Sequence, residues 1–215
     1  MVDELRSLRK LPYPSTLDQL PLPCGRALQF CRPPKAEALL EEMIRGPLDP
    51  DEKLPYWAEL WPSSVGLVWA IDEGRLSVEK AESWVELGAG LGLVSVAIAQ
   101  RGAMVTATDW IPDALVYAEE NARLNQTTLA TRVVDWRDPP ADLRPNRVIA
   151  STSFTRAGMP PGSLDSWSDG VAPILKCGLQ ILGGATALRF SRGSLGGASS
   201  EMRSTCEDRT FRSSP

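Results

Sequence analysis

A regular alternation of short apolar segments and amphipathic segments runs from Ser83 to Ser151 and limits the folds open to this chain. The segments that we expect to form strands are residues 83–88, 103–109, 131–136 and 146–151, and those that we expect to form helices are residues 91–102 and 111–126. Strands that alternate with helices form βαβ units, which build a parallel sheet with all strand ends at one edge. Ligands of such sheets bind at that edge.

The segments on either side of this core are less regular. Residues 1–53 predict an N-terminal arm with a short strand near residues 27–30 and a helix over residues 33–46, which starts with prolines and ends at a glycine. A core over residues 54–151 follows, and Pro62 opens a further helix in it.

The third segment, residues 152–215, is rich in Ser, Gly, Arg and Pro and has almost no apolar periodicity. This composition is typical of a disordered or foreign segment. We therefore expect the C-terminal strands of the sheet to be missing or disordered.

Composition excludes several classes of protein. The 215 residues are 43% hydrophobic and 23% charged, with a net charge of -4, which suits one domain and predicts no nucleic-acid partner. The absence of histidine argues against Ser-His-Asp or Cys-His catalysis and against a His-bearing metal site, and the four cysteines lack zinc spacing. No apolar run could span a bilayer and the charged start is no signal peptide, so we expect a cytoplasmic protein with reduced thiols.

The central binding signal is the turn after the first core strand, Val85-Glu-Leu-Gly-Ala-Gly-Leu-Gly92. Gly88 and Gly90 let the backbone approach a ligand, and the next helix offers free N–H groups at its N-terminus. A dinucleotide fingerprint would need its third glycine one residue later than Gly92. Glu86 would repel a pyrophosphate, so the turn favours a cationic ligand without phosphate.

Acidic residues also end the next two strands. Asp109 can accept hydrogen bonds from both hydroxyls of a ribose, and Asp135 can accept one from an adenine amino group that Trp136 covers. Together with Glu86, these residues fit S-adenosylmethionine, which carries a sulfonium, an ammonium, a ribose and an adenine. Each acid taken alone fits a structural role at a strand end, in a turn or as a cap as well as it fits a binding role. In the same way, Trp61 could be a core aromatic residue.

The stretch "WVELGAGLGLVSVAIAQRGAMVTATD" resembles the cofactor motifs of class I S-adenosylmethionine-dependent methyltransferases. The segments "LPYWAELWPSSVGLVWAI", "NARLNQ" and "VVDWRDP" are similar to the seven-strand protein-lysine methyltransferases, a family that includes the electron-transfer-flavoprotein β-subunit lysine methyltransferase and nicotinamide N-methyltransferase-like proteins. The resemblance covers residues 54–151. It implies an α/β, Rossmann-like fold with a parallel sheet and helices on both faces.

The same resemblance implies roles for particular residues and a reaction. The residues that it implies in cofactor binding are Glu86, Gly88 and Gly90 at the methionine end, Asp109 at the ribose, Asp135 and Trp136 at the adenine edge, and Trp61 near the methionine or the adenine. The implied activity is N-methylation of a protein lysine. The resemblance does not identify a catalytic residue in this chain.

Three other functions stay open at this point. One is N-methylation of a small, nicotinamide-like amine, and another is a non-catalytic, cofactor-binding remnant. The third is a nicotinamide-dinucleotide oxidoreductase, against which Glu86 and the glycine spacing argue.

The fourth strand departs from the family pattern. The family continues Ala-Ser with Asp-Val-Leu-Tyr-Glu or a similar run, whereas this chain continues Ala150-Ser151 with Thr-Ser-Phe-Thr-Arg156. The codons ACG TCC TTT ACG AGG encode the observed run, and one G placed before them yields GAC GTC CTT TAC GAG, which encodes the family run. We therefore hypothesise a frameshift after Ser151, with a divergent disordered tail as the alternative. In either case we expect weak cofactor binding and little or no activity.

Overall fold

The computed structural model describes residues 11–33, 39, 55–135, 140–151, 175–182 and 185–192. Their main body is a six-stranded sheet with the order β5-β4-β3-β6-β7-β8. Its strands are β3 (Ser83–Leu87), β4 (Met104–Asp109), β5 (Ala130–Val133), β6 (Arg147–Ala150), β7 (Leu175–Leu182) and β8 (Ala185–Arg192). All neighbouring pairs are parallel except β7 and β8. The predicted α/β fold with a parallel sheet is confirmed.

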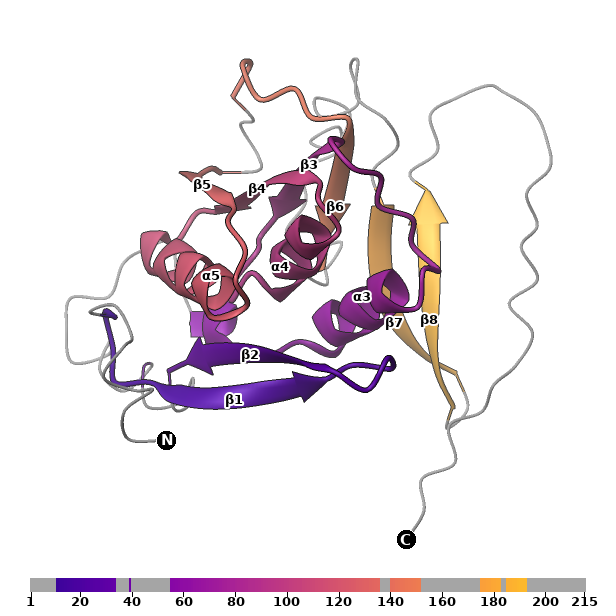
Figure 1. Cartoon of the computed structure of the whole chain (residues 1–215), viewed down its shortest axis with the longest axis horizontal. Coiled ribbons are helices and arrows are strands. Elements are labelled where there is room, and N and C mark those ends of the chain that lie inside the picture. The colour runs from indigo at the N-terminus through magenta and orange to yellow at the C-terminus, as the bar shows by residue number, and fades with distance from the viewer. Residues whose placement is uncertain are drawn as a thin grey trace, which may run out of the picture.

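Three helices lie side by side on one face of the sheet (Figure 1). They are α3 (Pro62–Asp72), α4 (Leu93–Gln100) and α5 (Pro112–Leu124). Proline stands in the first turn of α3 and of α5, where its missing N–H costs nothing. α4 is almost wholly apolar and buried because it lies between its two neighbours and the sheet.

The core strands bury side chains on both faces, as expected for a parallel sheet. Trp84 and Ile149 pack into the cluster under the helices, while Val85, Leu87 and Val148 belong to a separate apolar cluster. The described residues include no helix over this second cluster, so they do not test the prediction of helices on the opposite face.

The N-terminal arm contributes an antiparallel hairpin of β1 (Thr16–Pro21) and β2 (Ala27–Arg32), which runs beside α5 and α3 (Figure 1). The strand predicted near residues 27–30 is therefore confirmed as β2, whereas β1 was not predicted. A short 3-10 helix, η1 (Pro55–Ala58), precedes α3. Of the helix predicted over residues 33–46, only Leu39 is described apart from the first residue, and it is helical and buried.

The tail differs from its sequence-based expectation, which was that the strands after Ser151 are missing or disordered. β7 pairs parallel with β6, and β8 pairs antiparallel with β7 over its whole length, from Leu175 opposite Arg192 to Leu182 opposite Ala185. The physical reason is local, because two mainly apolar runs are separated by two glycines, a pattern that favours a tight hairpin.

Candidate functional site

The turn between β3 and α4 passes between two other elements of the core. Gly90 and Gly92 both have positive φ, +51° and +73°. A Cβ on Gly90 would lie 2.8 Å from the backbone oxygen of Trp57, and one on Gly92 would lie 2.5 Å from the Cβ of Ala118. Glycine is therefore required here both by backbone conformation and by space. We call residues 88–92 the glycine loop.

Glu86 lies two residues before the start of this loop, and its side chain is completely buried. Its Oε2 accepts hydrogen bonds from the backbone N–H of Ser95, at 2.9 Å, and from the Ser95 hydroxyl, at 2.7 Å. Ser95 is the third residue of α4, and the N-cap residue, Gly92, has no side chain to cap the helix. Glu86 therefore caps α4 from the neighbouring strand and places a carboxylate against the positive end of the helix.

Two serines from other elements complete the surroundings of Glu86. The Ser151 hydroxyl, at the end of β6, donates to Oε1 of Glu86 at 3.2 Å. The hydroxyl of Ser63, in the first turn of α3, donates to the backbone oxygen of Ser151. Burial raises the pKa of Glu86 to about 7, although its bonds from Ser95 and Ser151 favour the charged form and lower it.

Asp109, the last residue of β4, holds the glycine loop from the next strand. Its Oδ2 accepts the N–H of Gly90 at 2.9 Å, and its Oδ1 accepts the N–H of Ile111 at 3.0 Å. The residue is 7% exposed, and burial raises the pKa of its carboxyl in spite of these backbone donors. The N–H of Trp110 also favours the charged form, and a carboxylate offers about four lone-pair sites, so the group can still accept from a ligand hydroxyl.

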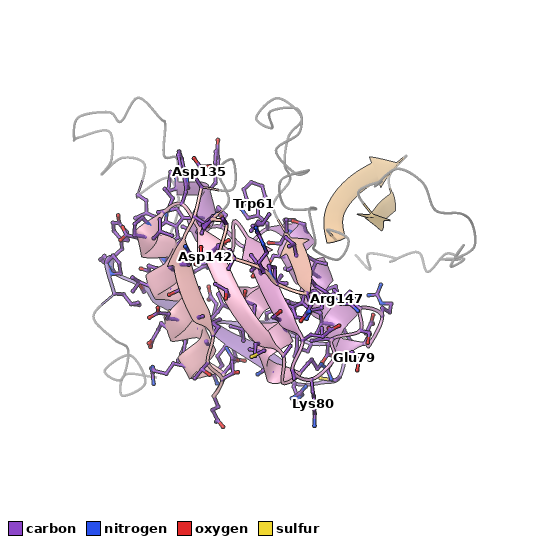
Figure 2. All side chains as sticks on the ribbon, turned by 90° about the horizontal axis from the view of Figure 1, so that it is seen from above. Trp61, Glu79, Lys80, Asp135, Asp142 and Arg147 are labelled. Atoms are coloured by element: carbon purple, nitrogen blue, oxygen red, sulfur yellow. The ribbon has the colours of Figure 1, made fainter. Side chains whose placement is uncertain are left out.

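Trp61 and Asp135 lie at the edge of the sheet where the strands end, and Figure 2 shows both at that edge, away from Glu79 and Lys80. Trp61 precedes α3, and its indole N–H donates to the backbone oxygen of Tyr56 at 2.9 Å. The two rings meet edge to face with centroids 6.1 Å apart, and Tyr56 is 59% exposed. Trp136 lies outside the described residues.

The structure thus brings four predicted residues to one place, because Glu86, Gly88, Gly90 and Asp109 share the ends of β3 and β4. Sequence reasoning missed Ser63, Ser95 and Ser151, which link three elements to Glu86. Serines carry no pattern of their own, so only the positions of Ser63 and Ser95 in the first turns of helices, and of Ser151 at a strand end, could have signalled them. It also missed Asn121, although the segment "NARLNQ" drew attention to it.

The arrangement has a clear chemical preference. A phosphate that approached the N-terminus of α4 would meet the Glu86 carboxylate, which already occupies the position where helix N-termini bind anions. Among the described residues, no Lys or Arg forms an ion pair with Glu86 or Asp109. Two acids without a counter-charge suit a cationic ligand that carries hydroxyls and no phosphate.

The part of the chain that the structure describes holds no group of three or more His, Cys, Asp or Glu residues that could bind a metal ion. Within the same residues, no helix has the length and apolar character that crossing a membrane would require.

Several solved structures of methyltransferases are similar to this chain. A 16S rRNA N2 G1207 methyltransferase of T. thermophilus, solved with AdoMet and guanosine, aligns over 81% of this chain and 45% of its own, with 15% identity and a TM-score of 0.55. Coclaurine N-methyltransferase, bound to N-methylheliamine and SAH, aligns over 53% of this chain and 34% of its own, with 16% identity and a TM-score of 0.44. The first of these two similarities shows that the fold is Rossmann-like.

A third structure is the Pyrococcus abyssi tRNA (uracil-54, C5)-methyltransferase with S-adenosyl-L-homocysteine, which shares 24% identity over 53% of this chain and 28% of its own, with a TM-score of 0.41. The chain thus spans less than half the length of each of these three proteins. A family model described as lysine methyltransferase matches residues 56–150. A search of the curated proteins finds no match.

Proposed function

We propose that this protein is an S-adenosylmethionine-dependent methyltransferase whose acceptor is the amine of a protein lysine. The observation that carries the cofactor assignment is the buried Glu86 carboxylate on the N-terminus of α4, beside the buried Asp109 carboxylate. This pair favours a cationic adenosine compound over a dinucleotide. The lysine assignment rests on the match of residues 56–150 to the lysine methyltransferase model.

In this proposal, different predicted residues bind different parts of the cofactor. Asp109 accepts a ribose hydroxyl with a lone pair that its backbone donors leave free. Glu86 supplies negative charge at the methionine end while it holds the first turn of α4 in place. Trp61 offers an aromatic surface at the same edge, and Asp135 and Trp136 complete the adenine side.

The cofactor supplies an activated methyl group on sulfur, and the acceptor nitrogen must reach that carbon in line with the bond that breaks. The protein has to hold an unprotonated amine in this position, and a dry site lowers the pKa of a lysine to favour that form. No histidine is needed, which agrees with a chain that has none.

The test of the cofactor is a binding titration of the purified chain with S-adenosylmethionine, S-adenosylhomocysteine and NAD. We expect binding of both adenosyl compounds and none of NAD. Tighter binding of NAD would overturn the proposal in favour of an oxidoreductase.

The test of the acceptor is transfer of a labelled methyl group to a lysine-rich protein, to the same protein with its lysines acetylated, and to nicotinamide. Labelling of the unmodified protein alone supports lysine methylation. Labelling of nicotinamide instead would identify a small-molecule N-methyltransferase, and binding without any transfer would identify a cofactor-binding remnant.

We also propose that the residues after Ser151 are read in a shifted frame, because the family continues its fourth strand with an Asp and a Tyr that this chain lacks. Sequencing the gene from Val148 to Pro160 tests this. An additional G that restores Asp-Val-Leu-Tyr-Glu would support the frameshift, and the restored chain should then turn over faster than this one. An unchanged reading would reject it.

A further inference from the structure

Asn121 is a fully buried amide on α5 that joins three separate segments. Its Oδ1 accepts the backbone N–H of Cys31 at 2.7 Å, and its Nδ2 donates to the backbone oxygen of Cys31 at 3.2 Å. The same Nδ2 donates to the backbone oxygen of Leu91, in the glycine loop, at 2.9 Å. Both amide protons are therefore used, and the two carbonyl partners determine which way the amide points.

One turn further along α5, Asn125 forms a similar pair of bonds with β2. Its Oδ1 accepts the N–H of Gln29 at 3.0 Å, and its Nδ2 donates to the Gln29 oxygen at 2.6 Å. Residues four apart share a helix face, and residues two apart present their backbone groups to the same side of a strand. The two asparagines thus take the place of a neighbouring strand along the open edge of β2, whose other edge pairs with β1.

The two asparagines differ in their contact with the glycine loop. Asn121 reaches the glycine loop through Leu91, whereas among the described residues the side-chain hydrogen bonds of Asn125 go to Gln29 and to the backbone of Asn121. The loop is consequently held from two sides, by Asp109 at the N–H of Gly90 and by Asn121 at the carbonyl of the next residue. The position of the N-terminal hairpin and the conformation of the glycine loop depend on the same amide.

We infer that Asn121 is a positioning residue for the cofactor, which couples docking of the β1–β2 hairpin to the conformation of the glycine loop. It acts through the backbone of Leu91 and touches neither the cofactor nor the acceptor. Docking of the N-terminal hairpin thereby influences the binding site, although the hairpin lies outside the Rossmann-like core. The effect on cofactor affinity rests on the proposed function, whereas the coupling of hairpin to loop does not.

The first test is hydrogen exchange of the full-length chain without ligand, comparing wild type, Asn121→Ala and Asn125→Ala. Both substitutions remove an amide that clamps β2, so both should speed exchange in the hairpin. Only Asn121→Ala should also speed exchange in residues 88–92. Equal protection of the loop in all three proteins would overturn the coupling, as would equal loss of protection in both variants.

The second test is the dissociation constant for S-adenosylmethionine at a temperature where all three proteins are folded. We expect a rise of about ten-fold for Asn121→Ala and of less than about two-fold for Asn125→Ala, the difference expected from one buried hydrogen bond. Equal effects would reduce Asn121 to a structural residue. If Asn121→Ala does not fold, Asn121→Ser replaces it, because its hydroxyl can retain one of the hydrogen bonds that the amide forms.

The two proposals can fail separately. A wild-type chain that does not bind S-adenosylmethionine would refute the proposed cofactor, and the exchange comparison alone would then decide the coupling. A wild-type chain that binds, together with an Asn121→Ala variant whose loop exchange and affinity match those of Asn125→Ala, would refute only the coupling.

Discussion

The acidic residues at the two ends of the strands differ in their partners and in the direction of their pKa shifts. At the end where the strands begin, Glu82 accepts from the guanidinium of Arg147 at 3.0 Å, and Arg147 stacks over the Trp84 ring at 5.3 Å. Burial opposes ionisation of Glu82, but the Glu79 N–H and Arg147 outweigh it and lower its pKa. At the end where the strands finish, burial raises the pKa values of Glu86 and Asp109.

Asp72, at the end of α3, behaves like Glu82. Burial opposes its ionisation, but the Cys24 N–H, Arg101 and Arg26 lower its pKa. In the described part of the chain, therefore, the protein neutralises these acids with its own cations and leaves Glu86 and Asp109 with uncharged donors only. A bound ligand can therefore supply the positive charge that balances Glu86 and Asp109, which is the pattern expected of a binding site.

The largest expected effect is that of Asp109→Ala on cofactor affinity. The substitution removes the acceptor for the Gly90 N–H and the proposed acceptor for the ribose, so affinity for S-adenosylmethionine should fall by about 100-fold. Calorimetric titration measures this. Glu82→Gln is the matched control, because it removes an acid from the opposite end of the strands and should change affinity by less than about two-fold. A comparable loss of affinity in both variants would contradict the proposal that only the acids where the strands finish bind the cofactor.

The second prediction concerns stability against pH. A carboxyl whose pKa is raised from its ordinary value to about 7 binds a proton more tightly when folded, so stability falls as pH rises through this interval. For Glu86 the loss should be about 2 kcal/mol between about pH 5 and about pH 8. Urea unfolding without ligand at both pH values measures it. Glu86→Gln should reduce the dependence and leave the part that Asp109 contributes in the same direction.

A pH dependence of the same magnitude or larger in Glu86→Gln would show that other groups control the loss of stability. Glu82→Gln serves as the control here too, because the pKa of Glu82 is lowered and its substitution should leave the fall between about pH 5 and about pH 8 in place.

The third prediction sharpens the role of charge at the site. Ionised Glu86 attracts a sulfonium, so affinity for S-adenosylmethionine should rise by up to about ten-fold from about pH 6 to about pH 8. S-adenosylhomocysteine, which lacks the sulfonium charge, should show a weaker dependence in the same titration. Identical pH profiles for the two compounds would mean that Glu86 acts only as a cap of α4.

The smallest expected effect is that of Arg147→Ala, at the other end of the strands. Its ion pair with Glu82 is partly exposed to solvent, so the free energy of unfolding should fall by about 1 kcal/mol or less. Urea unfolding at neutral pH measures this, and cofactor affinity should stay unchanged. A loss of affinity would show that the two ends of the strands are coupled.

The sequence by itself determined the core fold and the position of the site. Alternating periodicity predicted β3 to β6 and α4 and α5, and the glycines and acids pointed to the ends of β3 and β4. These features are local, since backbone conformation, side-chain periodicity and the position of a residue at a strand end can all be read along the chain.

Only the tertiary structure decided which acid is paired with a cation and which one has uncharged donors alone. Glu82 and Glu86 are the same residue type four positions apart, yet one faces Arg147 and the other faces Ser95 and Ser151. Likewise, Asn121 reaches Cys31 from 90 positions away and Leu91 from 30. Charge balance, burial and shared hydrogen bonds depend on partners that are distant in sequence, and only the packed chain brings those partners together.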